Sequence, residues 1–170
     1  MKTRNFMRLV VLLLMVMEMA SYAAAGSEAR KGTDRRPHAK ATFDALKPLA
    51  EQGSAVAQQE LGVMYRKGEG VRQDYAKAAK WFRRAADQGL AEAQNNLGGL
   101  YATGLGVEKD YVQAYKWFTL AASRKLAAGR DNRDKIAGEM TPDQIAKAKR
   151  LAQKWKPVEK NPLPENAHAQ

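Results

Sequence analysis

The sequence predicts an all-α protein, a short α/α superhelical solenoid of helix–loop–helix repeats with a capping helix at each end. A 36-residue unit occurs twice in succession, at residues 53–88 and 89–124, and 18 of the 36 aligned positions are identical. Self-similarity at a period of about 20–50 residues signals stacked supersecondary units. Apolar residues within each unit recur at helical spacing. The chain has no cysteine, which excludes disulfides, thiolate metal sites and a cysteine nucleophile.

The first 25 residues have the pattern of a secretory signal peptide. Three basic residues lie within the first eight positions, an apolar run follows over Leu9–Met17, and Glu18 ends it. Ala23–Ala25 then supplies a cleavage site of the A-x-A kind. The apolar run has nine residues, whereas a spanning helix needs roughly 20. We therefore expect residues 1–25 to be removed near Ala25 and the protein to be exported, periplasmic or secreted, without a stable membrane span.

Two segments precede the first repeat. Residues 26–41 are expected to form a flexible leader, because glycine, serine, charges and Pro37 occur there without apolar periodicity. An N-terminal capping helix follows, since Leu49–Gly53 matches Ala85–Gly89, the end of a second helix one period later. Pro48 cannot donate a helical hydrogen bond, so we expect a kink or a late start in this helix.

Each repeat is expected to begin with a helix that starts near Ala55 or Ala91. The small and apolar residues of its buried face are Ala57, Leu61, Met64 and Tyr65, then Ala93, Leu97, Leu100 and Tyr101. Gly62 and Gly98 lie inside these helices, where glycine costs about 1 kcal/mol relative to alanine. Their recurrence at one register indicates that a second helix approaches closely at this point.

A glycine-rich loop then leads into the second helix of each repeat. Gly68 and Gly104 stand where a left-handed residue would end the first helix. Asp74 and Asp110 precede the second helix, where a carboxylate accepts hydrogen bonds from free N–H groups and faces the positive end of the helix dipole. The buried face of the second helix is expected to hold Tyr75, Ala78, Trp81, Phe82, Ala85 and Ala86, with their equivalents one period on.

The solenoid is expected to span residues 42–155 and to close with an atypical pair of helices over residues 125–155. Thr141, followed by a proline and then by Gln144, has the pattern of a capped helix start. The apolar stripe behind it is Ile145, Ala148, Leu151, Ala152 and Trp155. Such a terminal element with a polar outer face is what solenoids need. Residues 156–170, rich in proline and poor in apolar residues, are expected to form a disordered tail.

The repeated residues carry a family resemblance. The shared pattern A-x-A-Q-x-x-L-G-x-x-Y-x-x-G-x-G-V-x-x-D-Y-x-x-A-x-K-W-F-x-x-A-A resembles the Sel-one-like repeat (SLR), a relative of the tetratricopeptide repeat. The resemblance implies an α/α superhelix that acts as an adaptor in protein complexes, a role common among exported bacterial proteins. It also implies that the first helices line the concave face, through positions two and four places either side of the buried leucine and tyrosine. Those positions are Gln59, Val63, Arg66 and Lys67, then Asn95, Gly99, Ala102 and Thr103.

These surface positions differ between the two copies, whereas the packing positions agree. A scaffold with a partner-specific surface would show this difference, and drift at exposed positions would show it too. The main hypothesis is a non-enzymatic adaptor that binds a protein or peptide of unknown identity through this face.

No catalytic, metal or cofactor site is expected. His38 and His168 lie in the leader and tail, away from any acidic residue at ligand spacing. Asp74 and Asp110 are equivalent helix caps rather than paired catalytic carboxylates. The glycine pairs do not form a phosphate loop, because neither a preceding strand nor a G-K-[S/T] sequence accompanies them. Tryptophan side chains of the second helices are expected in the core rather than at a ligand.

Two alternative functions stay open. The resemblance allows a cell-envelope hydrolase or β-lactam-binding protein, because some exported SLR relatives act in this way. Those relatives typically hold each hairpin with a disulfide, which this chain cannot form. The second alternative is a basic closing helix that contacts an anionic envelope surface, since residues 123–160 hold eleven Lys and Arg against five Asp and Glu. The whole chain carries a net charge of +11, but nucleic acid is not an expected partner of an exported protein.

Overall fold

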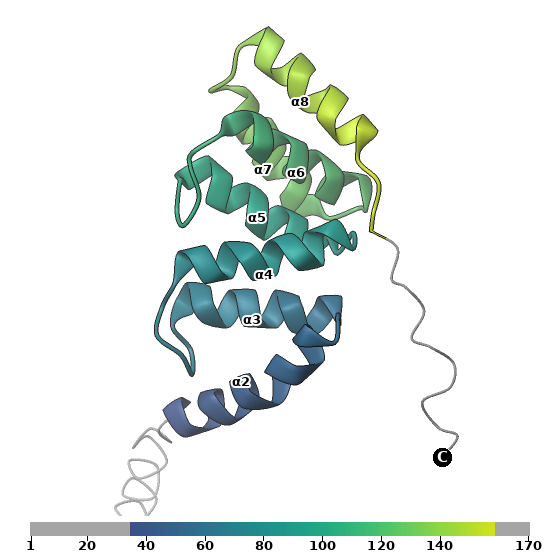
Figure 1. The fold of residues 1–170 in the computed structure, drawn as a ribbon. Helices are drawn as coiled ribbons and strands as arrows, with labels where there is room; N and C mark the ends of the chain where they lie inside the picture. Colours follow the sequence, from purple (N-terminus) through teal and green to yellow (C-terminus); the bar gives the residue numbers. More distant parts are fainter. Residues whose placement is uncertain (1–34, 159–170) are drawn as a thin grey trace, which may run out of the picture. The chain divides into compact units, whose positions relative to one another are not determined.

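The structure is a computed structural model that describes residues 35–158. The chain divides into a unit that ends at Arg35 and a second unit from Arg36 to Gln170, and the fold described here is that of the second unit. The expected signal peptide, most of the expected leader and nearly all of the expected tail lie outside the described residues. Within residues 35–158 every regular element is a helix (Figure 1). The helices are α2 (Arg35–Glu51), α3 (Ala55–Lys67), α4 (Tyr75–Asp87), α5 (Ala91–Thr103), α6 (Tyr111–Ser123), α7 (Ala127–Ala137) and α8 (Pro142–Lys154). The predicted all-α solenoid is therefore confirmed.

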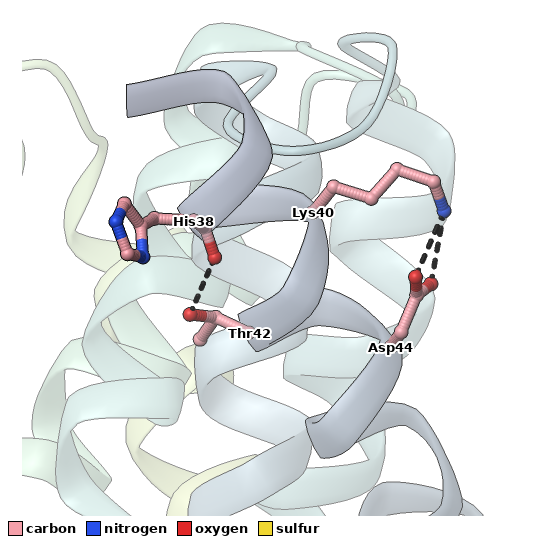
Figure 2. A network of polar contacts seen from close by, with 4 residues as sticks. All are labelled: His38, Lys40, Thr42 and Asp44. Carbon is pink, nitrogen blue, oxygen red and sulfur yellow. Dashed lines mark hydrogen bonds and ion pairs between the residues drawn. The ribbon is translucent and has the colours of Figure 1, made fainter. Parts of the chain in front are cut away.

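Helix α2 begins at Arg35, so residues 35–41 are helical rather than part of a flexible leader. Pro37 falls in the first turn of α2, where a missing N–H does no harm. Polar contacts between neighbouring turns continue the helix, as Figure 2 shows: the Thr42 hydroxyl donates to the His38 carbonyl at 2.9 Å. In the same turns Lys40 forms an ion pair with Asp44 at 2.9 Å.

The end of α2 acts as the N-terminal cap of the repeats. Pro48 lies inside the helix and does not end it. Phe43 and Ala50 are buried against α3, and the Phe43 ring meets the ring of Tyr65 edge-on with centroids 5.5 Å apart. The expected cap is therefore present, with its apolar side on the first helix of the first repeat.

The two repeats form the hairpins α3–α4 and α5–α6, with the predicted glycine and aspartate caps. Gly68 and Gly104 are left-handed, with φ of 75° and 76°. Asp74 accepts from the backbone N–H of Lys77 at 2.9 Å, which lowers the pKa of its carboxyl. Asp110 accepts from two backbone N–H groups at the start of α6, at 2.8 and 3.0 Å. Each hairpin thus has its turn closed and its second helix started by residues at the same place in the repeat.

A buried glutamine joins each hairpin to the helix before it. Gln94 is fully buried, and its Nε2 donates to the Ala86 carbonyl at the end of α4 at 3.2 Å. One period earlier, Gln58 Nε2 donates to the Ala50 carbonyl near the end of α2 at 3.0 Å. This repeated bond explains why the glutamine is identical in both copies, and it shows that the end of α2 imitates the end of a second helix.

Helices α7 and α8 follow in the order of a third repeat, but they pack differently from the two full repeats. Helix α7 takes the place of the first helix and lies against α6. Helix α8 starts with the predicted capping box, in which Gln144 N donates to Thr141 Oγ1 at 3.3 Å and Thr141 N donates to Gln144 Oε1 at 2.9 Å. Helix α8 then packs along α6, and its buried residues are Ala148 and Ala152.

The chain leaves α8 and returns toward α4. Trp155 meets Trp117 of α6 edge-on, with ring centroids 6.3 Å apart. Val158 N then donates to the Asp87 carbonyl at the end of α4 at 2.7 Å. The segment that follows α8 therefore contacts the second helices of both repeats. No helix within residues 35–158 is long and apolar enough to cross a membrane.

Candidate functional site

The four predicted surface positions on α3 differ in how accessible they are. Gln59 is 8% exposed and Val63 packs against the central apolar cluster, so these two side chains face the protein. Arg66 is half-buried and Lys67 is exposed, with an ion pair to Glu69 at 3.4 Å. The positions of Gln59 and Val63 were expected on the surface because the repeat pattern places them beside the buried leucine. The neighbouring helices close over this part of α3.

The predicted positions on α5 lie around a groove. Asn95 is half-buried and accepts a hydrogen bond of 2.9 Å from Nδ2 of Asn132 on α7. Gly99, Ala102 and Thr103 line a hollow between α5 and α7 with a volume of about 340 Å³. The Thr103 hydroxyl turns back onto its own helix and donates to the Gly99 carbonyl at 2.9 Å. Three of the predicted positions are therefore brought together at one place, while Asn95 holds α5 to α7.

The α5–α7 groove has an apolar floor and a polar rim. Its lining residues are Gly99, Ala102, Thr103, Tyr111, Phe118, Asn132, Lys135, Ile136 and Glu139. Phe118 and Ile136 are buried and form the floor, whereas Lys135 and Glu139 are exposed at the edge. At Gly99 a side chain would find open space, because no atom lies within 4 Å of the position of its Cβ. The groove can take an apolar group of a partner, with polar and charged groups of both signs around it.

The α7 side of the groove was missed in the sequence. Lys135 lies 36 residues after Gly99, and Glu139 lies 36 residues after Thr103, so both stand at predicted surface positions one period further on. The repeat frame contained the signal that would have found them. The third copy is otherwise divergent, because Arg133 stands in α7 where Leu61 and Leu97 stand in the full repeats.

A larger hollow of about 880 Å³ lies at the loop between α5 and α6. It is lined by Arg83, Tyr101, residues 107–113 and Gln144 of α8. Arg83 donates a hydrogen bond to the Tyr101 hydroxyl. Asp110 within it is already occupied as the cap of α6. Three of its polar side chains, Arg83, Tyr101 and Asp110, are therefore already engaged within the protein.

Charged groups surround the fully buried Trp117. The Arg83 guanidinium lies 4.9 Å and the Lys116 ammonium 4.3 Å from the centre of its ring. Burial lowers the pKa of Lys116, and the nearby Arg83 lowers it further, while Asp87 acts in the opposite direction. Burial raises the pKa of Asp87 against the attraction of Arg83 and Lys116. This cluster contains two positive groups and one carboxylate, all partly withdrawn from water.

Residues 35–158 contain no group of three or more His, Asp or Glu placed to hold a metal ion. His38 is exposed on α2, and His168 lies outside the described residues. The two aspartates considered as a carboxylate pair are both engaged as helix caps, as the repeat predicted.

Both repeats match a known repeat sequence. A sequence model of the Sel1 repeat matches residues 55–90 and 91–126, two residues out of phase with the frame chosen above. The chain carries two Sel1 repeats. Sel1 repeats as a class generally mediate protein–protein interactions, and the SLR fold is typically a non-catalytic interaction scaffold. No curated protein sequence gives a significant match to this chain.

Solved structures show the same fold around the Sel1 repeats. A protective antigen present in uropathogenic Escherichia coli strains, which displays an SLR fold, is 37% identical with a TM-score of 0.69. The match covers 76% of this chain and 28% of the antigen. A Sel1 repeat protein from Oxalobacter formigenes is 42% identical with a TM-score of 0.51, over 53% of this chain and 37% of that protein. This chain therefore spans only about a third of the length of these relatives.

Proposed function

We propose that this Sel1-repeat protein is an exported, non-enzymatic adaptor that binds a protein or peptide in the α5–α7 groove. The observation that carries the proposal is the groove itself, where Gly99, Ala102 and Thr103 meet the side chains of α7 around an apolar floor. The general role of Sel1 repeats in protein interactions supports it. Export is supported by the basic start, short apolar run and small-residue site of residues 1–25.

The groove favours a partner that inserts an apolar side chain. A volume of about 340 Å³ with Phe118 and Ile136 at its floor accommodates one large apolar residue rather than a folded domain. Lys135 and Glu139 at the rim can form hydrogen bonds or ion pairs with the partner's backbone and flanking residues. Affinity then comes from the buried apolar anchor, and orientation comes from the polar rim.

The test fills the groove without disturbing the fold. Gly99→Leu places an isobutyl group in open space, so the helix should stay intact while the partner's anchor is excluded. Ala45→Leu is the matched control, since it adds the same side chain at an exposed position of α2 outside the groove. Crosslinking pull-down from the envelope of the source cell should recover a partner with the wild type and with Ala45→Leu, and about ten-fold less with Gly99→Leu.

Circular dichroism should be the same for all three proteins. Equal recovery by Gly99→Leu and the wild type would remove the groove from the proposal. Export is measured separately, by N-terminal sequencing of protein from the envelope fraction. A mature N-terminus within a few residues of Gly26 is expected, and an intact Met1 on cytoplasmic protein would contradict it.

A further inference from the structure

The positive charge of the protein is concentrated on the second helices. Helices α4, α6 and α8 together hold nine Lys and Arg against two Asp and Glu, a net charge of +7. Helices α3, α5 and α7 hold five Lys and Arg against four Asp and Glu, a net charge of +1. The two sets of helices are similar in length, so the difference reflects where the charges are placed. The net positive charge of these six helices therefore lies almost entirely on the second helices.

Most basic groups of the second helices have no ion-pair partner among the described residues, whereas three of the five on the first helices have one. On the first helices, Lys67, Arg130 and Arg133 each have a carboxylate partner at 3.4, 3.5 and 2.6 Å. On the second helices, Lys77 alone has one among the described residues, Asp74 at 3.4 Å. The remaining eight, which we call the basic face, are Lys80, Arg83, Arg84, Lys116, Lys147, Lys149, Arg150 and Lys154. Six of them are exposed, and Arg83 and Lys116 are half-buried.

Tryptophan rings hold several of these cations in place. Arg84 lies 4.7 Å from the ring centre of Trp81, and Arg83 lies 4.9 Å from that of Trp117. Arg124, which follows α6 and lies outside the basic face as defined, is 5.9 Å from the ring centre of Trp155. A guanidinium stacked on an indole is a fixed planar fork, which matches the geometry of a phosphate group and loses little conformational entropy on binding. The three helices that carry these groups are neighbours, because Arg83 of α4 covers Trp117 of α6 and α8 packs along α6.

We propose that the basic face binds the surface of a bilayer that contains anionic phospholipids, through their phosphate head groups and without insertion. Among residues 38–158 the large exposed hydrophobic residues are Leu49, Val56, Leu105 and Val158, and all lie off α4, α6 and α8, so these three helices offer no large apolar anchor for the acyl layer. Six of its cations are exposed, two on α4 and four on α8, which suits an array of several head groups. The tryptophan rings are buried or covered by cations, so they offer no platform on which the bases of a nucleic acid could stack.

The experiment compares two triple variants of the full chain that have the same net charge. The first removes three exposed cations of the basic face, as Lys80→Gln, Lys149→Gln and Arg150→Gln. The second removes three exposed cations of the first helices, as Lys67→Gln, Arg130→Gln and Lys135→Gln. Each protein is sedimented at 0.1 M salt with vesicles of phosphatidylcholine alone and with vesicles that contain phosphatidylglycerol. The neutral vesicles measure any contribution from the apolar run near the N-terminus, which all variants share.

The wild type should bind the phosphatidylglycerol vesicles at least ten-fold more tightly than the neutral ones. Near an anionic membrane each cation contributes a factor of about 5, so the first variant should lose about 100-fold in affinity. The second variant should lose less than about five-fold. Equal losses by both variants would show that net charge alone matters and would overturn the proposal, as would equal binding to the two kinds of vesicle.

A soluble competitor distinguishes a membrane from a linear polymer. Inorganic polyphosphate at the same phosphate concentration as the lipid should leave most of the wild type on the vesicles. Displacement of the protein by polyphosphate would overturn the assignment to a bilayer. The peptide groove is unaffected in the first variant, so recovery of the partner by that variant separates the two proposals.

Discussion

The ring of Phe118 fills the space beside Gly98 in which a side chain would begin. A Cβ at residue 98 would lie 2.7 Å from the Cδ1 of Phe118, and the same relationship, at 2.5 Å, joins Gly62 to Phe82. The glycine at this register therefore allows the second helix of each hairpin to approach the first.

Substituting Gly98 should accordingly destabilise the protein although alanine is the better helix former. Gly98→Ala gains about 1 kcal/mol in helix propensity but forces overpacking that costs about 1–3 kcal/mol. Gly99→Ala, at the next position of α5, meets no atom within 4 Å and should stabilise by up to about 1 kcal/mol. Urea unfolding of both variants measures the contrast. A gain in stability for Gly98→Ala equal to that for Gly99→Ala would contradict the close approach.

The buried glutamine between hairpins should contribute measurably to stability. Gln94→Ala removes the hydrogen bond to the Ala86 carbonyl and leaves a cavity, so the free energy of unfolding should fall by about 2 kcal/mol. Gln153→Ala, at an exposed position of α8, should change it by less than about 0.5 kcal/mol. Urea titrations of the two variants decide it, and similar small effects for both would mean that the glutamine does not join the hairpins.

Trp155 should stabilise the protein through its contact with Trp117. A double-mutant cycle with Trp117→Leu and Trp155→Leu is expected to give a coupling energy of about 0.5–1.5 kcal/mol, typical of edge-on aromatic pairs. The pair of Trp81→Leu and Trp155→Leu is the control, because Trp81 belongs to the cluster formed with α2 and α3. A coupling no larger than that of the control would show that α8 is held on α6 by other contacts.

Lys125 occupies a turn that favours glycine. Its φ is 65°, and the equivalent positions one and two periods earlier are Gly89 and Gly53, with φ of 89° and 98°. Lys125→Gly should therefore raise the free energy of unfolding by up to about 1 kcal/mol. Lys149→Gly, inside α8, should lower it by about 1 kcal/mol. Thermal unfolding of the two variants should show shifts of opposite sign, and a loss of stability in both would contradict the left-handed turn.

Asp87 should make stability depend on pH in the unusual direction for a carboxylate. The pKa of its carboxyl is raised in the folded state, so the charged carboxylate destabilises the protein at neutral pH. This destabilisation decreases as pH falls through the raised pKa, and it is lost below the ordinary aspartate pKa of 3.8. Asp87→Asn removes the carboxyl group, so the gain in free energy of unfolding over the wild type should be largest at pH 7. That advantage should shrink as pH falls to about 3.5. Urea unfolding at pH 7, 5 and 3.5 measures it, and an advantage that grows toward acid would contradict the raised pKa.

Local and repeated signals predicted most of the fold. The hairpin frame, the aspartate caps, the left-handed glycines and the capping box of Thr141 were all visible, because each depends on a few neighbouring residues and recurs or has a fixed spacing. Helix α2 starts earlier than expected, at Arg35, because the first turn of a helix accepts a proline such as Pro37.

The surface was harder to predict than the core. Gln59 and Val63 occupy the same kind of position as residues of the groove, yet they are covered by neighbouring helices. Repeat position fixes the direction of a side chain from its own helix, but the packing of other helices decides whether water reaches it. The place of α8 along α6 was likewise invisible, because an apolar stripe shows that a helix packs without showing on which neighbour.

The bond from Gln94 to the end of α4, and its copy from Gln58 to the end of α2, has a consequence for how such a gene can evolve. Each repeat forms the same glutamine bond with the helix before it. An in-frame duplication of residues 53–88 at the Gln88–Gly89 boundary would therefore place a glutamine beside a helix end that can accept this bond. Beyond α6 the corresponding residue is Arg130, which cannot form that bond as glutamine does. Duplication inside the array therefore keeps this bond at each new junction, whereas the existing step from α6 to α7 lacks it.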